Sequence, residues 1–258
     1  MNEQPNSRPL EDRIGPAEVD MVSVGLGTLA GIIAGFFGGL LSFVASYVFV
    51  GMTKMAGTGV YPYLLSLVAF FSIVLSVSTY FVFMRMLFPD KYRGAGLGFG
   101  QILLFCIFSY ACVTPLYLAV GVIAPDQILL VFAVHVTLSV FGASLVLEIV
   151  SNYRYVLLGV YGSFLGLFAS VVITAVYFFS APESSRAIYS LLGLPVAIIG
   201  VMTLVRLLFE AVYSFLYRQI GIDPIGDIFA RIEEEELGDV RRAERELVRF
   251  GKKEEDGL

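Results

Sequence analysis

A few scattered side chains in this sequence could do chemistry. His135 is the single histidine, and Ser139 lies four residues later, so a helix would place the imidazole and the hydroxyl on one face. Ser72 and Ser76 repeat this spacing in an earlier segment. Ionisable side chains inside a membrane are functional candidates by default. These four residues could therefore line a polar path for a proton or a small solute.

Hydrogen bonding between helices is the other interpretation of these residues, and we favour it. A proton relay needs more than one station, and the sequence places no second titratable group at the expected depth of His135. Hydroxyls in membrane helices bond to their own carbonyl groups, or to a neighbouring helix at about 0.6 kcal/mol. Ser144 lies on the face opposite His135, so these two do not form a nucleophile and its base. We predict no catalytic residue and a non-enzymatic protein.

Three charged residues have the spacing of an interhelical ion pair. Glu148 lies about 21 residues into its apolar run and Arg206 about 19 into its own, so parallel helices would place them at similar depth. Glu210 follows Arg206 by one helical turn. We predict an ion pair among the three that clamps two helices together. The alternative is a gating role, which requires a second arrangement of the same groups.

Metal and cofactor chemistry are not expected. Cys106, Cys112 and His135 are too few for a zinc site made of protein ligands, which takes four. The two cysteines fall on different faces of one predicted helix, so they cannot form a disulfide with each other. Residues 25–30 fit a dinucleotide-binding glycine pattern, but they open an apolar run and follow no strand. We predict no metal and no cofactor.

The elements that position these residues are membrane helices. Of 258 residues, 57% are hydrophobic and 15% charged, with a mean hydropathy of +0.82, which excludes an ordinary soluble domain. Six apolar runs each have about the 20 residues that a membrane-spanning helix needs. We predict an all-α polytopic membrane protein, a six-transmembrane-helix bundle. Its parts are an N-terminal tail 1–20, a transmembrane domain 21–218 with helices near 21–52, 60–84, 96–123, 127–150, 155–179 and 187–217, and a charged amphipathic helical tail 219–258.

The distribution of lysine and arginine predicts the orientation. With both termini cytoplasmic, most basic residues fall on the inner side of the membrane, as the positive-inside rule requires. Lys91 and Arg93 then lie at the inner start of the third helix, where we expect them to contact lipid headgroups. Tyr92 would belong to the inner aromatic belt. The lack of a targeting signal favours the cell membrane.

A glycine zipper is the clearest packing pattern. Gly27, Gly31, Gly35 and Gly39 recur every four residues, so they lie on nearly one face of the first helix. Small residues let helices approach closely in lipid. This face could be an oligomer seam or line a pore, or it could be a packing groove for the fifth helix or another neighbour, which we favour. The fifth helix carries a related stripe, namely Gly159, Gly162, Gly166, Ser170 and Thr174.

The expected partners follow from the surfaces. The bilayer is the first, and a second copy or another membrane subunit could bind through the first helix. Residues 225–250 have apolar positions at helical spacing, which predicts packing on the chain itself or on a cytosolic or subunit partner. Acidic tails make nucleic acid a poor partner. We predict a structural or accessory subunit of a membrane assembly. The alternative is a passive channel or transporter for a small solute, and a membrane-embedded enzyme comes third.

Overall fold

The computed structural model describes residues 19–56, 60–89, 91–92, 98–150, 156–180, 182, 186–221 and 225. These residues form helices and connections with no strand among them, and six of their helices are long and apolar enough to cross a membrane. The predicted all-α architecture with six spans is confirmed, and the chain is a multi-pass membrane protein. Most of the predicted N-terminal tail 1–20 and of the tail helix 225–250 lies outside the described residues.

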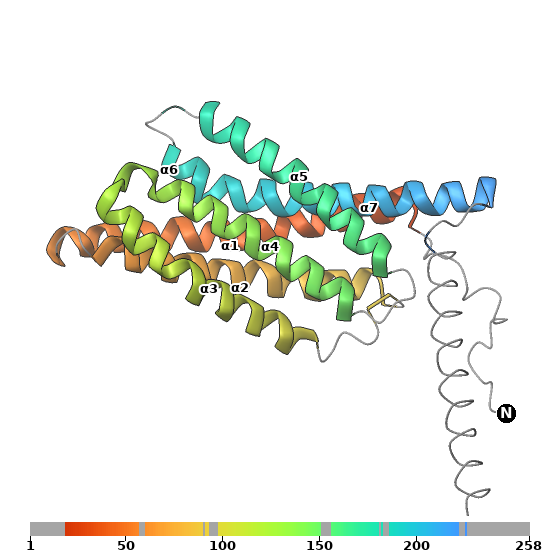
Figure 1. The fold of residues 1–258 in the computed structure, drawn as a ribbon, viewed down its shortest axis with the longest axis horizontal. Helices are drawn as coiled ribbons and strands as arrows, with labels where there is room; N and C mark the ends of the chain where they lie inside the picture. Colours follow the sequence, from red (N-terminus) through yellow and green to blue (C-terminus); the bar gives the residue numbers. More distant parts are fainter. Residues whose placement is uncertain are drawn as a thin grey trace, which may run out of the picture. The chain divides into compact units, whose positions relative to one another are not determined.

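The helix ends differ from the predicted ones by a few residues. The long helices are α1 (Met21–Ala56), α2 (Tyr61–Leu87), α3 (Gly98–Ile123), α4 (Ile128–Val150), α5 (Val156–Ser180) and α7 (Leu194–Ile220), as Figure 1 shows. A 3-10 turn, η3 (Pro125–Gln127), precedes α4. The short α6 (Arg186–Ile188) and the π-helical turn η4 (Tyr189–Gly193) lead directly into α7.

Two helix ends have a clear local cause. The carboxylate of Asp20 accepts a hydrogen bond from the backbone N–H of Ser23 at 2.8 Å, which caps the start of α1. The backbone N–H of Gly221 donates to the carbonyl of Tyr217 at 2.9 Å, and its φ of 70° favours glycine. The last helix therefore ends at Ile220, directly before Gly221.

The π-helical turn follows from Pro195. Proline has no N–H to donate, and its ring clashes with the carbonyl group four residues earlier, so a regular α-helical turn cannot continue there. The backbone N–H of Leu194 instead donates to the carbonyl of Tyr189, five residues back. The helix is therefore wider for one turn.

The bundle lies within the first of two compact units, Met1–Phe215 and Leu216–Leu258. Within it α1 packs along α2, α2 contacts both α3 and α4, and α5 packs along α4. The most apolar stretch of α4 is 67% buried, whereas that of α3 is only 17% buried. Thus α4 lies in the interior of the bundle, and α3 presents most of its surface outward.

Candidate functional site: an interhelical charge cluster

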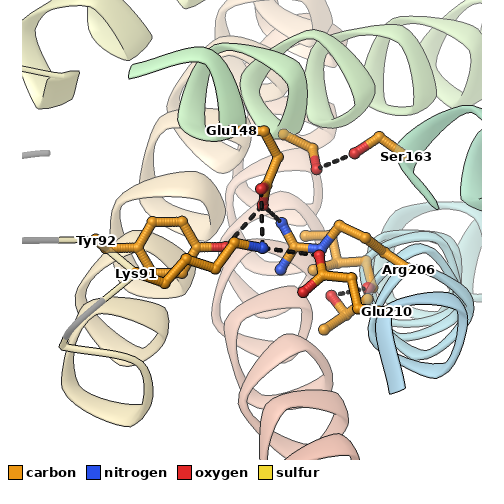
Figure 2. Close-up of polar contacts among 9 residues, drawn as sticks. Lys91, Tyr92, Glu148, Ser163, Arg206 and Glu210 are labelled. Atoms are coloured by element: carbon orange, nitrogen blue, oxygen red, sulfur yellow. Dashed lines mark hydrogen bonds and ion pairs between the residues drawn. The ribbon is translucent and has the colours of Figure 1, made fainter. Parts of the chain in front are cut away.

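Buried charges meet at the end of the bundle where α2 and α4 end and α5 begins. We call Lys91, Tyr92, Glu148, Arg206 and Glu210 the charge cluster (Figure 2). Lys91 Nζ lies 2.9 Å from Glu148 Oε2 and 2.7 Å from Glu210 Oε1. Arg206 Nη1 donates to Glu148 Oε1, and the Tyr92 hydroxyl donates to the same oxygen at 2.7 Å. The carboxylate of Glu148 on α4 thus receives donors from Lys91, Arg206 and Tyr92.

The structure brings together the three charged residues named from the sequence, with a different pairing for Glu210. Arg206 pairs with Glu148, whereas Glu210 pairs with Lys91. Our expectation that Lys91 contacts lipid headgroups was wrong, because only 6% of the residue is exposed. Tyr92, assigned to the aromatic belt, is fully buried. Charge balance could have revealed Lys91, since two glutamates and one arginine at one depth need a second cation.

Mutual neutralisation explains how these charges stay inside the bundle. Two cations and two anions are each at most 6% exposed. Removing a charge from water costs several kcal/mol, and only close opposite charges and hydrogen bonds repay that cost. The contacts of the charge cluster meet this condition, so the four side chains cross-link α4, α7 and the segment after α2.

The two residues outside the membrane-spanning segments have shifted ionisation. Burial lowers the pKa of the Lys91 ammonium, but the adjacent carboxylates of Glu148 and Glu210 outweigh burial and raise its pKa above the ordinary value. Burial raises the pKa of the Tyr92 phenol well above its usual value. Lys91 is therefore a cation and Tyr92 a neutral hydrogen-bond donor at neutral pH.

Arg206 uses only part of its guanidinium. The residue is fully buried, and its Cζ lies 5.8 Å from the centre of the Tyr80 ring, within cation–π range. Its Nε and Nη2 atoms are also buried and have no hydrogen-bond partner among the described residues. Buried polar atoms without partners are rare in proteins. The Nε and Nη2 edge of Arg206 therefore lacks an acceptor within the described part of the chain.

Glycines of α5 let its backbone approach the charge cluster. A Cβ atom added at Gly159 would lie 2.1 Å from Glu148 Oε2, and one at Gly162 would lie 3.0 Å from Cγ of Arg206. Further along, a Cβ at Gly166 would meet Met202. The hydroxyl of Ser170 donates to the carbonyl of Ile198 at 3.4 Å. The small-residue stripe of α5 thus faces α7, with its first glycine against α4.

The glycine zipper of α1 also faces α7. A Cβ atom added at Gly27 would meet Leu207, and one at Gly31 would meet Thr203. A Cβ added at Gly35 would lie 2.6 Å from the Pro195 carbonyl oxygen. At Gly39 the nearest atom is the carbonyl oxygen of Leu192, at 2.5 Å. The order of these contacts shows that α1 and α7 run antiparallel. The four glycines contact a helix of the same chain, so an oligomer seam or a pore along them would require α7 to move away.

His135 and Ser139 face α3. The Tyr117 hydroxyl lies 3.4 Å from His135 Nδ1, and the two rings meet edge to face. Ser139 forms a hydrogen bond of 2.7 Å with Ser109. The exposed fractions of His135 and Ser139 are 1% and 0%, so water does not reach either side chain from outside. Both therefore lie in a dry contact between α3 and α4.

Ser72 and Ser76 occupy the contact between α2 and α1. The Ser72 hydroxyl donates to the carbonyl of Gly38 at 2.6 Å. The Ser76 hydroxyl oxygen would lie 1.8 Å from a Cβ added at Gly38, so the serine occupies the space that glycine leaves empty. Its oxygen has no hydrogen-bond partner among the described residues. Close packing at Gly38 leaves no room for solute beside these hydroxyls.

The contacts of the charge cluster join helices and balance charge. Among the described residues, no group of three or more histidine, cysteine, aspartate or glutamate side chains could hold a metal ion. Comparisons with protein-family models, curated proteins and solved structures found no match for this chain.

Proposed function

We propose that the protein is a non-enzymatic structural or accessory subunit of a membrane assembly. The observation that carries this proposal is the dry interior. The four polar residues that could line a path, His135, Ser139, Ser72 and Ser76, are each at most 2% exposed and lie in contacts between neighbouring helices. A conduit requires polar side chains that water can reach. In this interior the hydroxyls and the imidazole serve helix packing instead.

The position of α7 supports the same role. Glycine stripes from α1 and α5 both approach its backbone, and the charge cluster attaches it to α4. Close backbone contact and interhelical hydrogen bonds are the main forces that hold helices together in lipid. A helix held in three ways suits a rigid scaffold better than a moving gate.

A passive channel or transporter is the second candidate, and the charge cluster is the observation that favours it. Charged side chains within membrane helices often mark ion or substrate paths. In this chain the four charges neutralise one another and are closed to water. Transport would require the cluster to open, so we rank this function below the structural one.

The partner surfaces of such a subunit are the outer face of α1 and the C-terminal tail. Leu29, Phe36 and Leu40 are more than 40% exposed on α1, away from the glycines that contact α7. Self-association or a second membrane subunit would use this face. We place the protein in the cell membrane with both termini in the cytoplasm, on the basis of the lysine and arginine distribution. A cytosolic partner would bind residues 225–250.

Cysteine accessibility tests the dry interior. In a variant without Cys106 and Cys112, single Ser139→Cys and Ser72→Cys substitutions are treated in lipid vesicles with a charged, water-soluble thiol reagent on both sides. We expect no labelling of either cysteine, while Asp20→Cys, at an exposed helix cap, reacts fully. Fast labelling at the positions 139 and 72 would show a water-filled path and would favour the channel.

Disulfide cross-linking tests the subunit surface. Phe36→Cys lies on the outer face of α1, whereas Gly31→Cys would point at Thr203 of the same chain. If α1 mediates self-association, oxidation in native membranes gives a covalent dimer for Phe36→Cys and none for Gly31→Cys. Monomer alone for both variants would exclude self-association through this helix.

A further inference from the structure

Two serine hydroxyls of α1 are buried beside the π-helical turn η4. Ser42 is fully buried and Ser46 is 4% exposed, and neither hydroxyl oxygen has a hydrogen-bond partner among the described residues. Ser46 follows Ser42 by one helical turn, so both lie on one face of α1. Buried polar atoms without partners are rare in proteins. This face of α1 therefore requires hydrogen-bond partners from outside the helix.

The neighbours of Ser42 on α1 show what this face meets. A Cβ atom added at Gly38 would lie 1.8 Å from Ser76 Oγ of α2, and one added at Gly39 would lie 2.5 Å from the Leu192 carbonyl oxygen of η4. Ser42 follows these glycines by four and three residues, so it lies one turn beyond them and between their directions. The Ser42 side chain thus points into the junction of α1, α2 and η4.

The usual acceptor of Ser42 within its own helix is already occupied. A serine in a helix can donate to the carbonyl group four residues earlier, which for Ser42 is that of Gly38. The Gly38 carbonyl accepts the hydroxyl of Ser72 at 2.6 Å in addition to the helical N–H of Ser42. A carbonyl oxygen has two lone pairs, and both are used here. The Ser42 hydroxyl therefore needs a partner on another element.

The turn η4 has a carbonyl group that lacks its donor. Pro195 has no N–H, so it cannot serve the carbonyl of Leu191, four residues earlier, or that of Ser190, five residues earlier in the π-helical pattern. The N–H of Leu194 serves neither, because it donates to Tyr189. Ser190 and Leu191 are both buried. At least one buried carbonyl oxygen of η4 is therefore left without a helical donor.

We propose that one water molecule is bound at the junction of α1, α2 and η4, between the Ser42 hydroxyl and this carbonyl oxygen. Water can donate to the carbonyl and exchange a hydrogen bond with Ser42, and Ser46 offers a third contact, the usual number for a buried water molecule. The segments 38–49, 62–76 and 189–195 contain no charged residue. An ion bound there would have no opposite charge beside it, so the neutral ligand is favoured.

The bound water supplies the donor that proline lacks and connects α1 to η4. Bridging water molecules are nearly as favourable in enthalpy as direct hydrogen bonds. A single enclosed water molecule does not form a path across the bundle. The inference therefore does not depend on the subunit role, and its tests leave that role untouched.

The thermal unfolding temperature of the full-length protein in detergent tests the proposal through the sign of one change. Ser42→Ala should lower this temperature by about 2–6 °C, because the water molecule loses a partner. A hydroxyl that has no partner gives the opposite sign, because its removal relieves a polar group from burial. An unchanged or higher unfolding temperature for Ser42→Ala would overturn the proposal.

Pro195→Ala shows whether Ser42 acts through η4. The substitution restores an N–H for the carbonyl, so Ser42→Ala should lower the unfolding temperature much less in this background than in the wild type. Ser66→Ala is the matched control, because Ser66 is also fully buried and its hydroxyl donates to the Tyr63 carbonyl at 2.7 Å. Its effect should be equal in both backgrounds. An equal effect of Ser42→Ala in both backgrounds would also overturn the proposal.

Radiolytic labelling followed by mass spectrometry detects the water molecule itself. Hydroxyl radicals formed from bound water oxidise the side chains next to it. Leu191 should therefore be oxidised although it is buried, whereas Leu207, which is similarly buried against α1, should not. Ser42→Ala should remove the oxidation of Leu191. Oxidation of Leu191 no higher than that of Leu207 in the wild type would contradict the proposal even if Pro195→Ala does not fold.

Discussion

Replacing Arg206 by methionine tests whether the charge cluster holds the bundle together. The substitution keeps an apolar side chain in the space but leaves Glu148, Glu210 and Lys91 with a net charge of −1. Removal of one partner from a buried ion pair costs about 3–5 kcal/mol. Lys91 still contacts Glu148, and the two unpartnered nitrogens of Arg206 disappear, so we expect the lower end, about 3 kcal/mol.

The double variant Arg206→Met with Glu148→Gln separates charge from packing. It leaves Lys91 and Glu210 as a neutral pair at 2.7 Å, with no excess charge in the interior. Replacement of a whole buried pair is far less costly than removal of one partner. We expect the double variant to recover about 2 kcal/mol of the loss caused by Arg206→Met alone.

Thermal unfolding in mild detergent, followed by circular dichroism, measures both variants. At about 2–4 °C per kcal/mol, the single variant should unfold some 6–12 °C below the wild type, and the double variant should lie between them. Arg85→Met is the control, because Arg85 is exposed and its loss should change stability by less than about 0.5 kcal/mol. An unchanged unfolding temperature for Arg206→Met, or a double variant as unstable as the single one, would refute the cross-linking role.

Further predictions concern the glycines and the pH dependence. Gly35→Ala should lower the free energy of unfolding by about 1–3 kcal/mol, because the added Cβ would lie 2.6 Å from a carbonyl oxygen of α7. Gly25→Ala, with no atom within 4 Å, should leave the unfolding temperature unchanged. Gly159→Ala would place a Cβ 2.1 Å from a cluster carboxylate and should lower the unfolding temperature at least as much as Gly35→Ala. The pKa values of Lys91 and Tyr92 are raised in the folded protein, so both groups stabilise it fully at a pH below their ordinary pKa values of 10.5 and 10.0. This contribution to stability is lost as the pH rises past the raised pKa values. A pH series of unfolding temperatures should therefore show no loss from these groups between neutral pH and about 9, and a decline in strongly alkaline buffer.

The sequence predicted the membrane helices well because hydropathy and length report directly on the lipid environment. The same signal does not identify neighbours. The stripe at Gly27, Gly31, Gly35 and Gly39 marks a close-packing face, and the fifth helix was only one of its expected partners. The structure places α7 and the η4 turn before it there, since the atoms nearest to the four glycines come from positions 192–207. A small-residue pattern specifies one surface of a contact, and the other surface has no matching pattern of its own.

Lys91 and Tyr92 were misplaced for a related reason. Periodicity arguments apply to helices, and these two residues lie in a connection followed by alternating glycines. Position near a membrane boundary suggested headgroups and an aromatic belt, which are the usual environments of such residues. The burial of Lys91 depends on two carboxylates that are far away in the sequence. Only the requirement for charge neutrality connects them before the fold is known.

The glycines and the charge cluster depend on each other. A side chain at position 159 would hold α5 away from α4, one at position 162 would hold it away from α7, and either would admit water to Glu148 and Arg206. Water would weaken the ion pairs by raising the local dielectric constant, and it would also remove the cost of an unpaired charge. Because glycine keeps the cluster dry, each charge must find a partner within the bundle. The same dryness that makes the cross-link strong therefore makes Glu148 and Glu210 require a cation between them, which Lys91 supplies.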